Sequence, residues 1–324
     1  MILVMKRLTL FSTLICLFLG CHKQEALLGE LSTGYYENGN RKEEGHLKNG
    51  KKEDKWFKWY ESSQLESETN YKNGQKHGKD LGWYENGKLQ YKFQFKNGLA
   101  DGKQTDWYEN GKLKTRGHFD NGKMHGKQGS WYINGKRKKE HTYRSDEIHG
   151  KQSEWYENGQ IKGRWYCETG RIHGKQTEWY DSGQKKLKGY RKNDRMDGLW
   201  IYWWENGQKK GEMVARNGKP HGKQLEWYEG GQMKQSGYYV KGVKDGSWTM
   251  WYPNGNKEGE TVVKDGMPDG KATQWHQNGR KMNEGYFKKG KRILVWSYWN
   301  DNGDIDRTEH YDESGSLMYR RFPE

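Results

Sequence analysis

Histidine recurs at one spacing along the chain, and histidine is the commonest protein ligand for transition metals. His77, His125, His149, His173 and His221 are separated by multiples of 24 residues. If equivalent residues lie two strands apart in a sheet, they are ~9.6 Å apart. Two ligands of one zinc ion lie only about 4 Å apart. Aspartate fills the same position elsewhere, at Asp101, Asp197, Asp245 and Asp269. We therefore interpret this column as a turn position and predict no metal site.

The other residues that could perform catalysis also follow the repeat and form no recognisable motif. Glutamates recur in register at turns, as at Glu85, Glu109, Glu157 and Glu205. Gly102-Lys103 and Gly270-Lys271 lack the spacing and the following Ser or Thr of a phosphate-binding loop. His-Glu-x-x-His, Gly-x-Ser-x-Gly and paired-cysteine motifs do not occur. We predict a protein that is not an enzyme and has no cofactor.

Aromatic side chains are the remaining candidates for binding, because exposed rings stack on sugars, bases or peptides. The chain has 17 Trp and 22 Tyr. The densest cluster and one of three similar Trp-x-x-Trp pairs contribute the candidate binding rings Trp200, Tyr202, Trp203, Trp204, Trp248 and Trp251. The alternative is that the rings pack on one another beneath Lys and Arg stems, with cation–π contacts.

These side chains belong to a strict repeat. Aromatic anchor residues recur every 24 residues without insertion or deletion. The anchors are Tyr35, Trp59, Trp83, Trp107, Trp131, Trp155, Trp179, Trp203, Trp227, Trp251, Trp275 and Trp299. Eleven identical spacings predict twelve tandem units, each of which contacts its neighbours.

Glycine marks three turns in each unit. The first glycine follows four residues after the anchor, usually as Asn-Gly, and Ser63 replaces it once. Asn-Gly between alternating segments predicts a type I′ hairpin, which requires positive φ. A second glycine lies fifteen residues after the anchor, where Asp146 and Asp194 are substitutes that tolerate positive φ. A third lies nineteen residues after it. The structural turn glycines include Gly87, Gly111, Gly126, Gly150, Gly174, Gly222, Gly246 and Gly270.

Two short strands per unit explain the alternation between these turns. The predicted fold is all-β: an elongated, twisted, antiparallel single-layer sheet of about 24 strands built from β-hairpins. An apolar column runs twelve residues after the anchors. It includes Cys167, which we interpret as a packing residue rather than a reactive thiol. Arg191 departs from the column, and we expect the preceding Tyr190 to replace it there.

Composition supports this fold and excludes others. Leu, Ile, Val and Phe together make up 44 of 324 residues, whereas Gly occurs 44 times and Pro four times. So few aliphatic side chains cannot build the core of a Rossmann or TIM-barrel enzyme, or a multi-pass membrane protein. The 15% aromatic content argues against disorder. The net charge is +15 and indicates anionic partners, or simply a solvated surface.

The first residues differ from the rest. Lys6 and Arg7 precede a short apolar run that ends in Phe18-Leu19-Gly20-Cys21. This pattern is typical of a secretory signal, and a cysteine after the cut resembles a bacterial lipoprotein signal. We predict a signal peptide over 1–20, an acylated (palmitate-type) Cys21 with a tether over 21–33, twelve repeats over 34–318 and a cap over 319–324. The alternative is an uncleaved anchor or a plain secretory peptide.

The repeat resembles a known family. The segment Gly237 to Asn256, with Trp248, Trp251-Tyr252 and Asn254-Gly255, is similar to the bacterial variant of the MORN repeat. That family is often labelled as an antitoxin component. The resemblance implies hairpin repeats that mediate binding to proteins or phospholipids, without enzymatic activity.

These observations predict a lipid-anchored envelope protein, in the outer membrane if the organism has two membranes, that binds a protein partner as a scaffold. The first alternative is that the repeat face binds anionic lipid or envelope polysaccharide directly. The second is an antitoxin-like inhibitor of a partner protein. The exported location argues against nucleic acid as the partner.

Overall fold

The computed structural model describes residues 29–324, and the predicted signal peptide and Cys21 lie outside the described residues. The chain divides into two compact units, one ending at Ile148 and one running from His149 to Glu324. Residues 29–324 form strands and turns only, so the all-β prediction is confirmed. Within that range no helix is long and apolar enough to cross a membrane.

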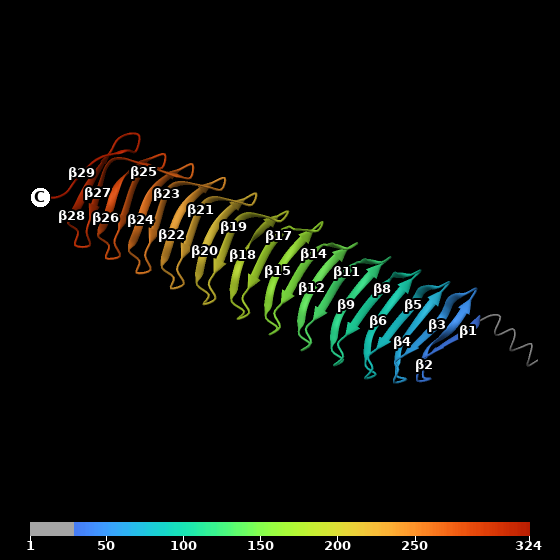
Figure 1. Cartoon of the computed structure of the whole chain (residues 1–324). Coiled ribbons are helices and arrows are strands. Elements are labelled where there is room, and N and C mark those ends of the chain that lie inside the picture. Colours follow the sequence, from blue (N-terminus) through green and yellow to red (C-terminus); the bar gives the residue numbers. More distant parts are fainter. Residues whose placement is uncertain (1–28) are drawn as a thin grey trace, which may run out of the picture. The chain divides into compact units, whose positions relative to one another are not determined.

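The first unit consists of antiparallel strands that pair with their neighbours in the chain (Figure 1, blue to green). Its strands are β1 (Glu30–Tyr35), β2 (Arg41–Lys48), β3 (Lys51–Trp59), β4 (Leu65–Lys72), β5 (Gln75–Trp83), β6 (Leu89–Lys96), β7 (Leu99–Ala100), β8 (Gly102–Trp107), β9 (Leu113–Asp120), β10 (Lys123–Met124), β11 (Gly126–Trp131), β12 (Arg137–Arg144) and β13 (Glu147–Ile148).

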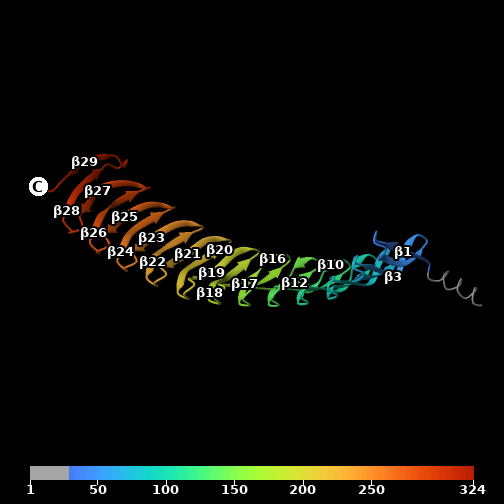
Figure 2. The same ribbon diagram turned by 60° about the horizontal axis from the view of Figure 1, so that its bottom comes forward.

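The second unit continues the same pattern, and Figure 2 shows that its later strands are bent along their length. Its strands are β14 (Gly150–Trp155), β15 (Ile161–Glu168), β16 (Arg171–Ile172), β17 (Gly174–Trp179), β18 (Lys185–Lys192), β19 (Arg195–Trp203), β20 (Lys209–Arg216), β21 (Lys219–Trp227), β22 (Met233–Val240), β23 (Val243–Trp251), β24 (Lys257–Lys264), β25 (Met267–Trp275), β26 (Lys281–Lys288), β27 (Lys291–Trp299), β28 (Ile305–Tyr311) and β29 (Leu317–Arg321).

The described strands number 29 rather than 24, chiefly because a bulge divides some of the predicted strands into two. Pairs such as β7/β8, β10/β11 and β16/β17 are separated by one residue at the third turn mark. The ends of the array also differ from the prediction. Strand β1 begins at Glu30, inside the predicted tether. Strand β29 pairs with β28 through Arg321, so residues 319–321 belong to a strand rather than a cap.

The first turn of each repeat is not the predicted type I′ turn. In the first repeat Tyr36 N donates to Asn40 O at 2.8 Å and Gly39 N donates to Tyr36 O at 3.0 Å. Of the three loop residues, Gly39 has positive φ (85°) and Asn38 does not. These features define a type I turn followed by a left-handed residue, which forms a G1 bulge. The predicted turn glycines Gly87 and Gly111 occupy this left-handed position, as does Ser63.

The second turn is the type I′ hairpin. Asn49 and Gly50 both have positive φ, and Lys48 pairs with Lys51 across a two-residue loop. Asp146 and Asp194 have φ of 69° and 65°, so the prediction that they substitute for glycine is confirmed. The Asn-Gly dipeptide therefore forms two different turns within this first repeat, at Asn38-Gly39 and at Asn49-Gly50.

The third glycine lies at the bulge inside the second strand. Gly78 has φ of 97°, and the register between β4 and β5 shifts between Thr69 and Tyr71. The remaining predicted turn glycines all have positive φ at this position: Gly126, Gly150, Gly174, Gly222, Gly246 and Gly270. Two repeats place other residues there, Asp54 (φ 56°) and Leu294 (φ 61°).

Side chains alternate between two sides of each hairpin. We call face A the side that carries residues eight, ten, twelve and twenty-one positions after each anchor. Pairing places these residues opposite one another, as for Met213 and Gln224. We call face B the side that carries the anchor itself and residues nine, eleven and twenty positions after it, which pair as Lys223 does with Tyr238.

Tryptophans on face A form the core, and each lies over a glycine. A Cβ added to Gly189 would lie 2.2 Å from the Trp200 ring, and one added to Gly237 would lie 2.2 Å from the Trp248 ring. Trp56 over Gly45 and Trp296 over Gly285 repeat the arrangement. Trp200 is 1% exposed and Trp248 4% exposed. As core residues these two do not offer a ring for stacking, so predicting them as binding aromatics was wrong.

Two other residues of face A test the predicted column. Cys167 is 3% exposed, and burial raises the pKa of its thiol, which fits the predicted packing role. Arg191 stays in the column, with its guanidinium 5.2 Å from the centre of the Trp200 ring and its Nε donating to Gln176 Oε1 at 2.6 Å. Tyr190 is exposed on face B. The expectation that Tyr190 would replace Arg191 was wrong, because the strand keeps its register there.

Candidate binding faces of the repeats

The tyrosine after each anchor connects one repeat to the next. Tyr156 Oη donates to Trp179 O at 2.9 Å, and Tyr180 Oη donates to Trp203 O at 2.9 Å. In the first unit Tyr36, Tyr60, Tyr84 and Tyr108 do the same, each at 2.8 Å. Trp204 takes this role in one repeat, donating its Nε1 to Trp227 O. These tyrosines stabilise the array and do not form a free row of rings.

The asparagine of the first turn has two roles. Asn158 Oδ1 accepts from Gln160 N at 2.9 Å, and its Nδ2 donates to Asp181 O in the next repeat at 2.6 Å. Asn206 and Asn254 make the same pairs of bonds. Sequence reasoning recognised this asparagine as a turn residue, but it missed the bond to the following repeat.

Lysine ammonium groups lie near two of the remaining candidate rings. Lys185 Nζ lies 6.0 Å from the centre of the Trp203 ring, and Lys210 Nζ lies 4.2 Å from that of Trp204. Trp251 is half-buried and its carbonyl accepts from Tyr228 Oη at 2.9 Å. Tyr202 lies on face A, stacked at 6.4 Å on Trp200, and burial raises its pKa. The four half-buried candidates therefore contribute to packing between repeats.

The histidine column lies beside the bulge. His77 Nδ1 lies 3.3 Å from Asn97 Oδ1, and His173 Nδ1 lies 3.3 Å from Asn193 Oδ1. These two histidines thus contact the type I′ turn of the next hairpin. Within residues 29–324, His, Cys, Asp and Glu side chains do not converge in groups of three that could hold a metal ion.

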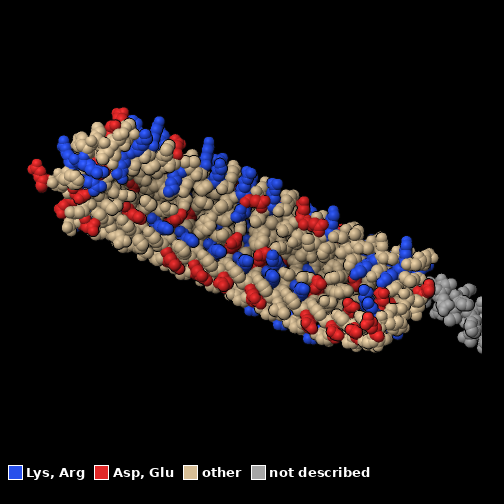
Figure 3. Space-filling model, in the orientation of Figure 1, with Lys and Arg blue, Asp and Glu red and all other residues tan. Residues whose placement is uncertain are grey.

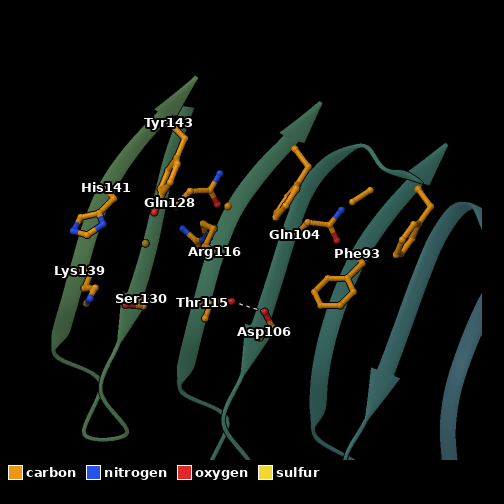
Figure 4. A pocket seen from close by; sticks show the side chains of 15 residues that line it. Phe93, Gln104, Asp106, Thr115, Arg116, Gln128, Ser130, Lys139, His141 and Tyr143 are labelled. Carbon is orange, nitrogen blue, oxygen red and sulfur yellow. Dashed lines mark hydrogen bonds between the residues drawn. The ribbon is translucent and has the colours of Figure 1, made fainter. Parts of the chain in front are cut away.

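Face A of the first unit contains a hollow of about 430 Å³ (Figure 4). It opens where Gln104 and Gln128 replace the tryptophan that fills this position in other repeats. Figure 4 shows Gln104, Gln128 and Tyr143 on the same side of β8, β11 and β12. Four aromatic residues contribute to the wall, Phe93, Phe95, Phe119 and Tyr143, and Asp106, Arg116, Lys139 and His141 also line it.

Three polar side chains of this hollow make local hydrogen bonds. Gln128 Nε2 donates to His118 O at 2.7 Å, and Gln104 Nε2 donates to Gln94 O at 2.7 Å. Asp106 accepts from Thr115 Oγ1. An aromatic wall with a bonded polar rim suits the binding of an apolar group more than proton transfer.

A second hollow, of about 190 Å³, lies on face A of the second unit. Here Ala272 takes the tryptophan position, and Met250, Pro268 and Phe287 line the space. Both hollows include a position that holds tryptophan in four other repeats.

Comparison with known families agrees with the repeat geometry. The model of the MORN repeat variant matches nine segments that together cover more than half of the chain: 31–49, 55–73, 76–97, 100–121, 148–166, 172–193, 196–217, 220–241 and 244–265. This chain belongs to the MORN repeat variant family. The structure contains the same hairpins over β10–β12 and β26–β28, where no segment matches.

Solved structures share only a weak likeness with this MORN chain. A complex of TcdB2 and TccC3 matches with 9% identity and a TM-score of 0.20, covering 89% of this chain and 21% of that one. A Tc holotoxin pore of Photorhabdus luminescens matches with 10% identity and a TM-score of 0.18, covering 89% and 17%. The chain thus spans about a fifth of the length of these proteins. No curated protein has a significantly similar sequence.

Proposed function

We propose that this MORN protein is a non-enzymatic binding module of the cell envelope, tethered through a lipid on Cys21. Its partner is a protein that inserts an apolar side chain into the hollow of the first unit. The observation that supports the proposal is the hollow itself, in which Gln128 stands where four other repeats have a buried tryptophan.

The aromatic residues of the hollow favour an apolar side chain as its occupant. A volume of about 430 Å³ accommodates one aromatic side chain with room for a second group, and interface anchors are characteristically aromatic or aliphatic groups in such pockets. The walls of the hollow belong to consecutive strands β6 to β12, which hold them rigidly.

Two alternative functions would require different properties of the surface and of the partner. Anionic lipid or envelope polysaccharide would require exposed cations, and binding would weaken as salt increases. An antitoxin-like role would require a toxic partner in the same compartment, which an exported address makes difficult. A protein anchor in the hollow predicts binding that persists in high salt.

The test is capture from an envelope extract of the native cell by soluble chain beginning at His22, at low and high salt. The decisive variant is Gln128→Trp. Gly117 lies opposite it with no Cβ, as Gly189 lies opposite Trp200, so the new ring has space and fills the hollow. We expect a folded protein that loses its partner.

The control is Gln64→Trp, which adds the same ring at an exposed turn of the first unit. It should capture the partner as the parent does. If Gln128→Trp still captures the same protein with equal yield, or if only salt-sensitive lipid or glycan is recovered, the hollow is not the binding site.

The tether has its own test. Cys21→Ser should move the full-length protein from the detergent phase to the aqueous phase after phase partition, since acyl chains provide the membrane affinity. Cys167→Ser is the matched control. A Cys21→Ser protein that remains in the detergent phase would contradict the lipid anchor.

A further inference from the structure

Face B of the second unit carries an exposed apolar row that the proposed function does not use. Eleven residues after successive anchors stand Tyr166 (40% exposed), Tyr190, Tyr238 (51%), Val262 and Tyr286, with a half-buried Val214 among them. The equivalent residues of the first unit are all polar: His46, Asn70, Gln94, His118 and Thr142. The row is therefore specific to one unit, not a property of the repeat.

A second row lies directly beside the first. Lys175 pairs with Tyr190 on the adjacent strand, and Lys223 pairs with Tyr238. The same position holds Lys151, Leu199, Ser247, Lys271 and Val295 in the other repeats. We call these two rows together the tyrosine–lysine stripe. It runs across the strands. The first row supplies an apolar group at each of its six positions, and the second row has lysine at four of its seven positions.

The turns at one end of the stripe are mainly basic, while Glu212, Glu260 and Glu284 lie beside it on face B, and Lys271 Nζ lies 3.2 Å from Glu284 Oε2. The type I′ turns next to it carry mostly Lys and Arg, and Figure 3 shows such residues gathered along one side of the view, with Asp and Glu along the opposite side. Exposed cations of these turns in the second unit are Arg171, Lys192, Arg195, Arg216, Lys219, Lys241, Lys264, Lys288, Lys289 and Lys291. Acidic residues at the same turns are Glu168, Asp194 and Asp265. The stripe therefore suits an anionic ligand.

The period of the stripe indicates the conformation of that ligand. Equivalent side chains of neighbouring repeats lie two strands apart, ~9.6 Å. A polyproline II helix has 3 residues per turn and rises ~3.1 Å per residue, so its side chains repeat every ~9.3 Å. The two periods differ by about 0.3 Å, which lets one face of such a peptide meet successive repeats.

We propose that the tyrosine–lysine stripe binds an acidic, proline-rich protein segment in the polyproline II conformation, lying across the strands. Tyrosine rings pack on proline rings, which is how aromatic grooves recognise this conformation elsewhere. The lysines pair with carboxylates that recur every third residue. This inference rests on the protein-binding function proposed above and assigns it a second, separate surface.

The composition of the row favours a peptide over an acidic glycan. Sugar rings stack on aromatic faces, whereas Val262, Leu199 and Val295 offer none. The same aliphatic groups pack well on proline. An acidic glycan is therefore the competing ligand that the experiment must include.

The probe is a peptide of about five Glu-Pro-Pro triplets, about 45 Å long in the extended helix. Affinity for the soluble chain is measured by fluorescence anisotropy at low salt. Comparison ligands are a Glu-Gly-Gly peptide of equal charge, a Lys-Pro-Pro peptide and a hyaluronan oligosaccharide. We expect the Glu-Pro-Pro peptide to bind at least about tenfold more tightly than each of them.

Variants then locate the site. Tyr190→Ser with Tyr238→Ser should weaken peptide binding by about tenfold or more, as loss of aromatic anchors does, and Lys175→Glu with Lys223→Glu should do the same. Gln94→Ser with His118→Ser changes the same column of the first unit and should leave affinity unchanged. Equal binding of the Glu-Gly-Gly peptide, tighter binding of the glycan, or indifference to the stripe variants would each overturn the proposal.

The two proposals fail separately. Gln128→Trp should not alter peptide affinity, because the hollow lies on face A of the first unit. A chain that captures its partner through the hollow and ignores the Glu-Pro-Pro peptide would retain the proposed function and refute the stripe.

Discussion

Single glycines on face A decide where tryptophan can be buried. Gly189 has ordinary strand geometry, so its backbone conformation does not require glycine. Glycine is required there because a side chain would overlap the Trp200 ring. The Trp200 ring occupies the volume that a Cβ would fill. The sequence contains the signal for this pairing, because in four repeats a glycine is followed eleven residues later by tryptophan. Glycine was interpreted only as a turn residue, so the pairing was missed.

Gly189→Ala should destabilise the protein by about 1–3 kcal/mol, since the new methyl group overlaps a ring that cannot move away. Urea unfolding provides the measurement. Gly211→Ala is the control, because its added Cβ would meet nothing closer than 3.4 Å. In a Trp200→Ala background the cost of Gly189→Ala should disappear. An equal cost in that background would show that the ring is not the cause.

Glu309 is a buried carboxylate at the end of the second unit, 3% exposed. Burial alone would raise its pKa, but hydrogen bonds outweigh burial and lower the pKa to about 2, from an ordinary value of 4.5. The donors are Tyr298, Tyr311, Arg307 and Arg320.

A lowered pKa in the folded state means that stability is gained above pH ~4.5 and lost as the pH falls towards 2. Glu309→Gln should cost roughly 2–3 kcal/mol at pH 7 and should flatten the pH dependence of unfolding below pH 5. Chemical unfolding at several pH values tests this. A variant that keeps the parent's acid slope would show that other carboxylates cause it.

At the scale of elements, Asn-Gly predicted hairpins correctly but did not specify both turn types. The type I′ turn at Asn49-Gly50 follows from a two-residue loop with positive φ at both positions. The loop at Asn38-Gly39 has three residues, because Tyr36 makes both closing bonds with its own backbone. A dipeptide does not determine where those bonds form.

Leu294 occupies the bulge with φ of 61°, a conformation that is costly for a branched side chain. Nine other repeats have glycine there. Leu294→Gly should therefore stabilise the second unit by about 1 kcal/mol, although it removes an exposed apolar side chain. The melting temperature is the readout. Val295→Gly, one residue later in ordinary strand geometry, should destabilise, and a loss of stability in both variants would contradict the argument.

At the scale of the whole molecule, the repeat period, the two strands per repeat and the all-β class could be read from spacing. The hollow and the tyrosine–lysine stripe could not. Both depend on comparing single columns between repeats, because Gln128 and Tyr190 become informative only beside Trp200 and Gln94. Burial of Trp200 could not be predicted from the sequence either. Strand alternation assigns a ring to one face of the sheet but does not tell which face is packed with side chains.

Strands form hydrogen bonds mainly with their neighbours in the chain. A destabilising substitution should therefore loosen only the strands around it, as in other repeat proteins. Gly285→Ala should increase amide hydrogen exchange in β26, β27 and β28. Exchange in β2 to β6 should remain at the parent level. Hydrogen exchange read by mass spectrometry distinguishes this from cooperative unfolding, in which both units would lose protection together.

The glycine–tryptophan pairs also define how such a gene can lengthen. Gly45 and Trp56 lie between two successive anchors, as do Gly189 and Trp200. A duplicated segment of DNA that runs from one anchor codon to the next carries a ring together with the space that receives it. A duplication that begins between the two would place tryptophan against a residue with a Cβ. Packing therefore restricts which duplicated segments give a well-packed array: those whose boundaries do not separate a glycine from its tryptophan.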